Sequence, residues 1–165
     1  MTVIDGIDAQ VQAAFVALYQ ETYGRVLRYA ARRVGQGSDA EDVAAEVFRI
    51  AWARASEGTS ISTGWLFVTA DNVLRNHHRS ERRAHRLALA AADGQRTVGA
   101  VGTDDRVLDV LESLDEPTRA ILVLRYWDEL SGAEIGTVLG LSASAVWVRL
   151  HRARKAFTSA YEGVS

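Results

Sequence analysis

The chain has no cysteine and only one proline among its 165 residues. Without cysteine it can form neither a disulfide nor a thiolate metal or redox site, which favours a reducing compartment such as the cytoplasm. Because proline breaks helices, its near absence suits a helical protein. The content of 48% hydrophobic and 24% charged residues is that of a folded globular chain rather than a disordered one.

Long hydrophobic runs and catalytic motifs are missing as well. No apolar run approaches the roughly 18 residues that a membrane span needs, and residues 1–10 carry acids without a basic segment. We therefore expect neither export nor membrane insertion. The sequence contains no P-loop, no Gly-x-Ser-x-Gly motif and no convincing pair of carboxylates. We expect no catalytic residue and no cofactor.

The chain lacks an excess of positive charge, since its net charge is −2, and this argues at first against a nucleic-acid-binding protein. The distribution of charge argues otherwise. Residues 75–86 hold five Arg and one Glu, and residues 142–161 hold three Arg and one Lys without an acid, whereas residues 104–116 hold six acids and one Arg. Such segregation indicates several surfaces with different partners, although charge runs can also be plain solvated helix faces.

Hydrophobic residues recur at helical spacing along most of the chain, and no segment shows the two-residue period of a strand, so the predicted fold is all-α. The first helix carries an apolar stripe, ended by Gly35 and Gly37. Ser38 and Glu41 match a capping box that would open a second helix. The stripes of these two helices are Phe15, Leu18, Tyr19, Thr22, Val26, Tyr29 and Ala30 for the first, and Val43, Val47 and Ile50 for the second.

A third helix is predicted from Trp65 through Arg83, with Ala92 as the alternative end, and it is apolar at first and strongly basic later. Residues 84–103 are rich in Ala and Gly without a large aromatic residue and are predicted to be a linker. We therefore expect two small helical domains, at residues 10–83 and 104–161.

The second domain contains a helix-turn-helix pattern. After a helix that starts at Asp115 with Pro117, Ser131 and Glu134 form a capping box for a short helix, and Gly140 turns the chain toward a longer helix capped by Ser142. In that last helix Val146, Leu150, Ala153 and Phe157 share the inward face. The outward residues are Ser144, Trp147, Val148, Arg149, His151 and Arg152.

The second helix of a DNA-binding helix-turn-helix lies in the major groove, where Arg can bond guanine and Ser can reach bases or phosphates. Trp147 and Val148 are unusual base readers, although they can contact thymine methyl groups or pack against a protein. The alternative interpretation is an amphipathic helical hairpin without DNA binding.

Three blocks of the chain stand out as motifs: residues 38–52, beginning SDAEDV, residues 64–79, beginning GWL, and residues 124–155, running from LRYW to RLHRARK. In this order they resemble the extracytoplasmic-function sigma factors, which are two helical domains joined by a flexible linker. The resemblance implies a region 2 domain at residues 10–83 and a region 4 domain at residues 104–161, with RNA polymerase core enzyme and promoter DNA as partners. It also implies an anti-sigma protein as a regulator.

The resemblance further implies three sets of contact residues. The helix at residues 39–52 would dock on the clamp helices of the largest polymerase subunit, and residues 65–83 would melt and capture the minus-10 element. The last helix-turn-helix would read the minus-35 element. The expected polymerase contacts are Asp39, Asp42, Glu46 and Arg49; the minus-10 contacts are Asn72, Arg75, Asn76, Arg79, Arg82 and Arg83; the minus-35 contacts are Ser142, Ser144, Trp147, Val148, Arg149, His151, Arg152 and Lys155.

The chain departs from the family pattern at four of its positions. Family members often carry Arg in place of Asp71, Asp in place of Asn76, and polar residues in place of Trp147 and Val148. The resemblance therefore does not carry over a promoter preference.

Two other classes of protein remain open from the residues alone. A conventional helix-turn-helix regulator would bind duplex DNA unaided, and a protein-interaction module would not bind DNA. His77 and His78 are adjacent and point about 100° apart on a helix, so we expect them to lie in the basic DNA-facing stretch and expect no metal site. Trp52, Trp65 and Trp127 are expected to belong to the hydrophobic core.

Overall fold

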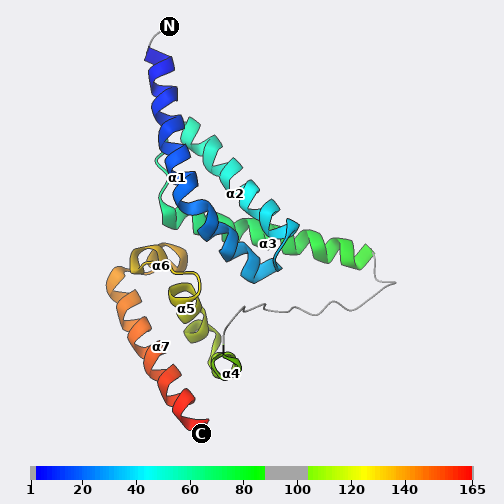
Figure 1. Cartoon of the computed structure of the whole chain (residues 1–165), viewed down its shortest axis with the longest axis vertical. Helices are drawn as coiled ribbons and strands as arrows, with labels where there is room; N and C mark the ends of the chain where they lie inside the picture. The colour runs from blue at the N-terminus through cyan, green and yellow to red at the C-terminus, as the bar shows by residue number, and fades with distance from the viewer. Residues whose placement is uncertain (1–2, 88–103, 165) are drawn as a thin grey trace. The chain divides into compact units, whose positions relative to one another are not determined.

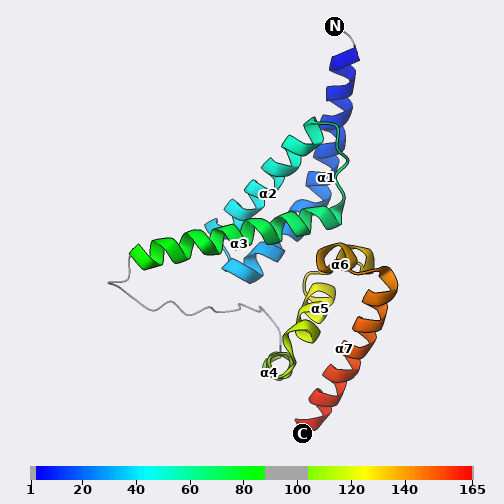
Figure 2. The same ribbon diagram turned by 180° about the vertical axis from the view of Figure 1, so that it is seen from behind.

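The computed structural model describes residues 3–87 and 104–164, with the side chains of residues 9–83 and 104–164. Every regular element within these ranges is an α-helix, so the predicted all-α class is confirmed. The helices form two compact units (Figures 1 and 2). Most of the predicted linker, residues 88–103, lies outside the described residues.

The first unit consists of α1 (Val3–Val34), α2 (Ser38–Ser56) and α3 (Thr63–Leu87), each packed against the other two (Figure 1). Tyr29 of α1 meets Phe67 of α3 edge to face, with ring centroids 5.3 Å apart. Small residues let the helices approach closely around these rings. The buried hydrophobic residues are Val26, Tyr29, Ala30, Ala40, Val43, Ala44, Val47, Phe48, Ala51, Leu66, Phe67, Ala70 and Leu74.

The turn between α1 and α2 is partly as predicted. Gly35 and Gly37 have φ angles of 86° and 113°, values that glycine adopts without a Cβ penalty. The predicted capping box is wrong, because Gly37 rather than Ser38 is the N-cap and no side chain caps the helix. The first helical bond runs from the amide of Glu41 to the carbonyl of Gly37, so Ser38 lies one position inside the helix and cannot serve as its cap.

The third helix starts two residues before Trp65 and ends between its two predicted ends. The hydroxyl of Ser62 accepts a hydrogen bond from the amide of Trp65 at 3.2 Å and satisfies one free donor at the start of α3. The helix ends at Leu87, between Arg83 and Ala92, the two ends predicted from the sequence. The basic segment is therefore presented on a continuous helix.

The second unit consists of α4 (Asp105–Ser113), α5 (Glu116–Tyr126), α6 (Gly132–Leu139) and α7 (Ala143–Gly163). Asp104 caps α4, and the predicted caps of the other helices are confirmed: Asp115 for α5, the Ser131 and Glu134 capping box for α6, and Ser142 for α7. The core of this unit comprises Val110, Leu111, Ile121, Leu122, Leu124, Leu130, Ile135, Val146, Leu150 and Ala153.

The turn between α6 and α7 sets a helix-turn-helix angle. The two helices meet at 99°, within the range of about 90–120° for this motif. Gly140 ends α6 in the left-handed conformation with φ of 66°. A Cβ on Gly136 would lie 2.8 Å from the carbonyl oxygen of Leu141, so the turn can fold back on α6 only where a side chain is missing.

Among the described residues, no single helix is both long and apolar enough to cross a membrane; α6 and α7 meet such a test only as a bent pair.

Candidate nucleic-acid interface

The exposed face of α7 agrees with the sequence prediction. Val146, Leu150 and Ala153 are buried and Phe157 is half-buried, and all the predicted minus-35 residues, from Ser142 to Lys155, are exposed. Ser144, Val148, His151 and Lys155 follow one another at helical spacings of four, three and four residues, so they form one line opposite the core. Trp147, Arg149 and Arg152 flank this line.

The charges on this face are free to meet an anion. Among the described residues, Arg149, Arg152 and Lys155 form no ion pair, and α7 contains no acid before Glu162. The Ser142 hydroxyl already accepts the amide of Ala145 and lies 3.2 Å from the hydroxyl of Ser144. Ser142 is thus engaged as a cap, which leaves the cations and Ser144 as the main polar groups.

Two large hydrophobic side chains interrupt this basic face. Trp147 is 68% exposed and Val148 is 49% exposed. Neither side chain belongs to the buried core of the unit.

The basic residues of α3 form a second surface, on the first unit. Asn72, Arg75, Asn76, Arg79, Arg82 and Arg83 are all exposed, and their spacing places them on one face of the helix. Leu66, Ala70 and Leu74 occupy the opposite, buried face. We call the six exposed residues the α3 stripe.

Asp71 lies beside the α3 stripe and pairs with one of its members. A guanidinium nitrogen of Arg75 is 3.1 Å from the Asp71 carboxylate, which also accepts the hydroxyl of Tyr29 at 3.2 Å. Asp71 therefore joins α1 to α3 while neutralising part of the stripe. Among the described residues, Arg79, Arg82 and Arg83 form no ion pair.

The predicted polymerase-contact residues lie on α2. Asp39, Asp42 and Arg49 are exposed and Glu46 is half-buried. Arg49 donates two hydrogen bonds to Glu46, at 2.7 and 2.8 Å. These bonds lower the pKa of Glu46 and raise the pKa of Arg49 from their usual values. Because the two opposite charges are paired, Glu46 and Arg49 together add almost no net charge to the surface that Asp39 and Asp42 make acidic.

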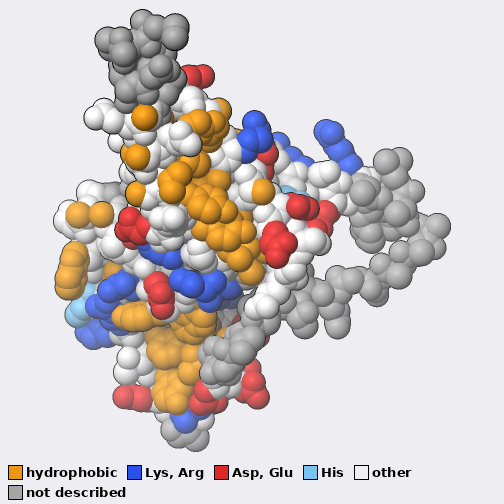
Figure 3. All heavy atoms as spheres, turned by 45° about the horizontal axis from the view of Figure 1, so that its top comes forward, with side chains coloured by type: hydrophobic (Ala, Val, Ile, Leu, Met, Phe, Trp, Pro, Cys, Tyr) orange, Lys and Arg blue, Asp and Glu red, His pale blue; other side chains and the backbone are white. Residues whose placement is uncertain are grey.

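An aromatic band on α1 and α2 was missed by the sequence analysis. It comprises Phe15, Tyr19, Tyr23, Phe48 and Trp52, with ring centroids 4.8–6.4 Å apart. Hydrophobic side chains also gather on the surface in Figure 3. Tyr19 is 39% exposed and Trp52 is 41% exposed.

The core assignment of the tryptophans is accordingly wrong. Trp52 is exposed, and Trp65 and Trp127 are only half-buried. Trp52 lies beyond the last buried residue of α2, Ala51, and its ring packs edge to face on Phe15 of α1. Helical periodicity identifies an apolar stripe, but it does not show which part of that stripe a neighbour covers.

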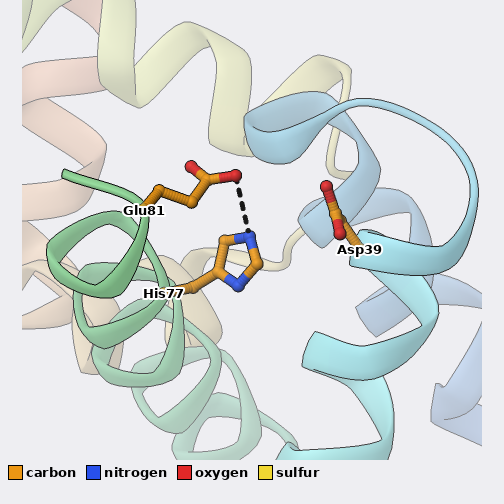
Figure 4. Close-up of side chains that lie close together, drawn as sticks. All are labelled: Asp39, His77 and Glu81. Carbon is orange, nitrogen blue, oxygen red and sulfur yellow. Dashed lines mark ion pairs between the residues drawn. The ribbon is translucent and has the colours of Figure 1, made fainter. Parts of the chain in front are cut away.

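The two histidines of α3 also differ from expectation. His77 is 24% exposed and lies 3.4 Å from the carboxylate of Glu81, four residues later; His78 lies 3.8 Å from the same carboxylate. The sequence analysis overlooked Glu81 as a partner, although its spacing from His77 could have revealed it. The side chain of Asp39, from α2, faces the same place (Figure 4).

Comparison with known proteins agrees with this architecture. The family described as sigma-70 region 2 matches residues 18–84, and sigma-70 region 4 matches residues 104–157. An ECF RNA polymerase sigma factor, SigL of Mycobacterium tuberculosis, is 32% identical, with 94% of this chain and 93% of the relative covered. NccH of Alcaligenes xylosoxydans xylosoxydans, an RNA polymerase sigma factor, is also 32% identical over 90% of this chain and 87% of its own.

Solved structures give the same result. The structure of CnrH in complex with the cytosolic domain of CnrY covers 96% of this chain and 97% of its own, with 32% identity and a TM-score of 0.59. RpoE of Bartonella quintana, solved with the anti-sigma factor NepR, shares the fold at 18% identity and a TM-score of 0.59. With both family regions present and relatives matched along nearly their whole length, the chain belongs to the extracytoplasmic-function subfamily of the sigma-70 family and is a sigma factor for transcription initiation.

Proposed function

We propose that this sigma factor recognises promoters through α7 and the α3 stripe and binds the polymerase core through the exposed face of α2. The observation that carries the proposal is that two separate helices each present unpaired cations on the face opposite their buried one. A single DNA-binding surface would suffice for a conventional regulator, whereas promoter opening needs a duplex reader and a single-strand binder.

The α7 face suits duplex DNA. Its helix-turn-helix would place the first turns of α7 in the major groove, where Ser144, Val148 and Arg149 reach base edges and Arg152 and Lys155 reach phosphates. Trp147 is positioned to contact thymine methyl groups or the sugar edge. We assign the minus-35 element to this surface.

The α3 stripe suits a strand that has left the duplex. Arg side chains can contact its phosphates, and the amides of Asn72 and Asn76 can hydrogen-bond to an exposed base edge. Extruding a base costs a few kcal/mol, which such contacts can offset. We assign the minus-10 element to this surface, and no catalytic group is needed, since the polymerase performs the chemistry.

The α2 face and the aromatic band suit protein partners. Asp39, Asp42, Glu46 and Arg49 offer a charged docking surface for the polymerase clamp helices, and the neighbouring aromatic rings provide the apolar area that protein interfaces favour. CnrH was solved with the cytosolic domain of CnrY. An anti-sigma protein that covers these surfaces would hold this sigma factor inactive, and we place both interactions in the cytoplasm.

Run-off transcription of fragmented genomic DNA would test the proposal. Purified core polymerase is incubated at fixed salt with and without the sigma factor, because phosphate contacts are salt-sensitive. We expect discrete new transcripts that share two upstream elements. Core binding without transcripts would favour a regulator, and absence of core binding would overturn the proposal.

The α7 assignment needs its own arm of this test. The double variant R149A/R152A is assayed on the same templates, with core binding measured in parallel. If the variant supports the same transcripts at the same yield, α7 does not read the promoter and the unit acts as a protein-interaction module.

A further inference from the structure

Three potential metal ligands come together at the junction of α2 and α3. The carboxylate of Asp39, from the first turn of α2, and the side chains of His77 and Glu81, one turn apart on α3, place one ligand atom each within 4.8 Å of the others. Figure 4 shows the imidazole of His77 next to the Glu81 carboxylate on α3, with the Asp39 carboxylate nearby on α2. The cluster therefore links residues 38 positions apart in the sequence and belongs to the tertiary structure rather than to one helix.

A hydrogen bond does not account for the arrangement. The Nε2 atom of His77 is buried and has no hydrogen-bond partner, although the Glu81 carboxylate oxygen is only 3.4 Å away. A charge-assisted hydrogen bond between such groups would be about 2.7–2.9 Å long. A buried nitrogen without a partner is costly, so this atom faces the carboxylates without the bond that would explain its position.

The same distance fits a shared cation. Zinc binds imidazole nitrogen and carboxylate oxygen at about 2.0–2.2 Å in a tetrahedron, so two ligand atoms of one site lie about 3.4 Å apart. The separation of His77 Nε2 and Glu81 Oε1 is 3.4 Å. Asp39 is exposed, and one of its carboxylate oxygens lies within 4.8 Å of the other two ligand atoms, so a rotation of this short side chain can bring the oxygen to the ion.

We propose that Asp39, His77 and Glu81 form a binding site for a divalent first-row cation of the zinc class. One imidazole and two carboxylates suit zinc better than magnesium, which prefers an all-oxygen octahedron that keeps several waters. Three protein ligands leave a fourth position for water. The two carboxylates together neutralise the charge of the ion.

The site has a structural consequence for the first unit. A cation held there ties the start of α2, which lacks a side-chain cap, to the basic half of α3. It also removes Asp39 from the set of exposed acids available to a protein partner. Because the ion binds only the folded arrangement, it stabilises the unit in proportion to its free concentration.

Zinc binding to the full, tag-free chain tests the proposal. The protein is stripped with EDTA, exchanged into chelator-free buffer and titrated with zinc against a chromophoric competitor. The ligand variants are D39N, H77Q and E81Q, and the matched control is H78Q, which removes the adjacent imidazole. Thermal unfolding of each protein is recorded with zinc, with magnesium and with EDTA.

We expect one zinc ion per chain, with affinity lowered by about tenfold or more in each ligand variant, since even residues that only support a metal ligand cost that much. H78Q should bind like the unaltered protein. Zinc should raise Tm in the unaltered protein and in H78Q but not in H77Q, and magnesium should not do so. Unchanged zinc affinity in H77Q would overturn the proposal.

A purely ionic cluster would give a different pattern. If a protonated His77 simply pairs with Asp39 and Glu81, H77Q lowers Tm equally in EDTA and in zinc, and zinc does not shift the unaltered protein. That result would also overturn the metal site. Neither readout depends on transcription.

Discussion

The two basic surfaces differ in how the fold defines them. The α7 surface starts at a capped helix end, behind a turn fixed by Gly136 and Gly140, and carries Trp147 and Val148 among its cations. The α3 stripe runs along a long helix, contains only Arg and Asn, and has no apolar member. The α7 surface is defined by a rigid turn and combines cationic with hydrophobic side chains. The α3 stripe is defined by positive charge repeated along one helix.

This difference indicates two kinds of recognition. A fixed helix start with few cations and two hydrophobic residues suits sequence reading in a groove of defined shape. Repeated positive charge suits binding along the phosphates of a nucleic-acid strand without recognition of its bases, and the affinity of such binding depends strongly on salt. The comparison predicts that substitutions on α7 change which DNA is bound, whereas substitutions on α3 change how strongly binding depends on salt.

The largest expected effect comes from the double variant R149A/R152A. A well-placed Arg contact to a base edge, as assigned to Arg149, is worth about 1–3 kcal/mol, so its loss alone should lower promoter-specific transcription by about fivefold or more. Loss of the Arg152 phosphate contact should lower transcription further. Quantitative run-off transcription on one promoter measures this, with core binding as a second readout.

The matched control for α7 is R154A. The Arg154 guanidinium hydrogen-bonds the hydroxyl of Tyr126, and Arg154 is half-buried whereas Arg149 and Arg152 are exposed, so R154A should keep most of the activity. An equal loss in R154A would show that the helix is sensitive to any change of charge, and the α7 surface would then resemble the α3 stripe.

A smaller effect, on stability, is expected from G136A. The added methyl group would meet the Leu141 carbonyl oxygen at 2.8 Å, and such overpacking typically costs about 1–3 kcal/mol. Hydrogen exchange should show faster opening of α6 and α7 and unchanged protection in α1 to α3. The control is G132A, whose new Cβ would have no neighbour within 4 Å. Equal destabilisation by both variants would refute the close approach as the cause.

Local chemistry made the helix-turn-helix predictable. The Ser131 and Glu134 capping box, the Ser142 cap and Gly140 act within a few residues, and all are found as predicted. Ser38 and Glu41 show the same motif, but the positive φ of Gly37 moves the cap one residue earlier. A capping-box motif therefore predicts the first residue of a helix only where no adjacent residue takes the N-cap position instead.

Tertiary packing explains what the sequence could not show. The exposure of Trp52 depends on which helix covers the end of α2, and the approach of Asp39 to His77 depends on how α2 crosses α3. Neither follows from spacing along the chain. The outward faces of α3 and α7 were predictable because each is opposite a regular hydrophobic stripe, whereas the contact partners assigned to those faces remain predictions.

The double variant R79Q/R82Q should sharpen the contrast between the two surfaces. If both guanidiniums contact phosphates of a single strand, the slope of log affinity against log salt should fall by about 1.4 in magnitude, since each contact contributes about 0.7. Binding of a melted minus-10 strand by the polymerase holoenzyme, measured by fluorescence anisotropy over a range of salt, gives this slope.

A matched variant removes the same charge elsewhere on the first unit. R28Q/R32Q alters two arginines of α1 that lie outside the stripe and should leave the slope unchanged. If both double variants lower the slope equally, net charge rather than the position of the stripe governs binding.

The smallest expected effect concerns Glu46 on α2, where a charged surface faces a protein instead of DNA. Its ion pair with Arg49 is exposed, so E46Q should leave Tm nearly unchanged at neutral pH. The folded pKa of Glu46 is lowered, so its small contribution to stability is present above the unfolded pKa and is lost as pH falls through the folded one.

Core binding should nevertheless weaken a few-fold in E46Q, because exposed charges act chiefly on the association rate of protein partners. Surface plasmon resonance on immobilised core enzyme would show a lower association rate that converges with the unaltered rate at high salt. E41Q, on another face of α2, should associate normally. A slower association rate in both variants would mean that the total negative charge of α2, and not the face carrying Glu46, attracts the polymerase. Recognition by α2 would then depend on repeated charge, as we propose for the α3 stripe.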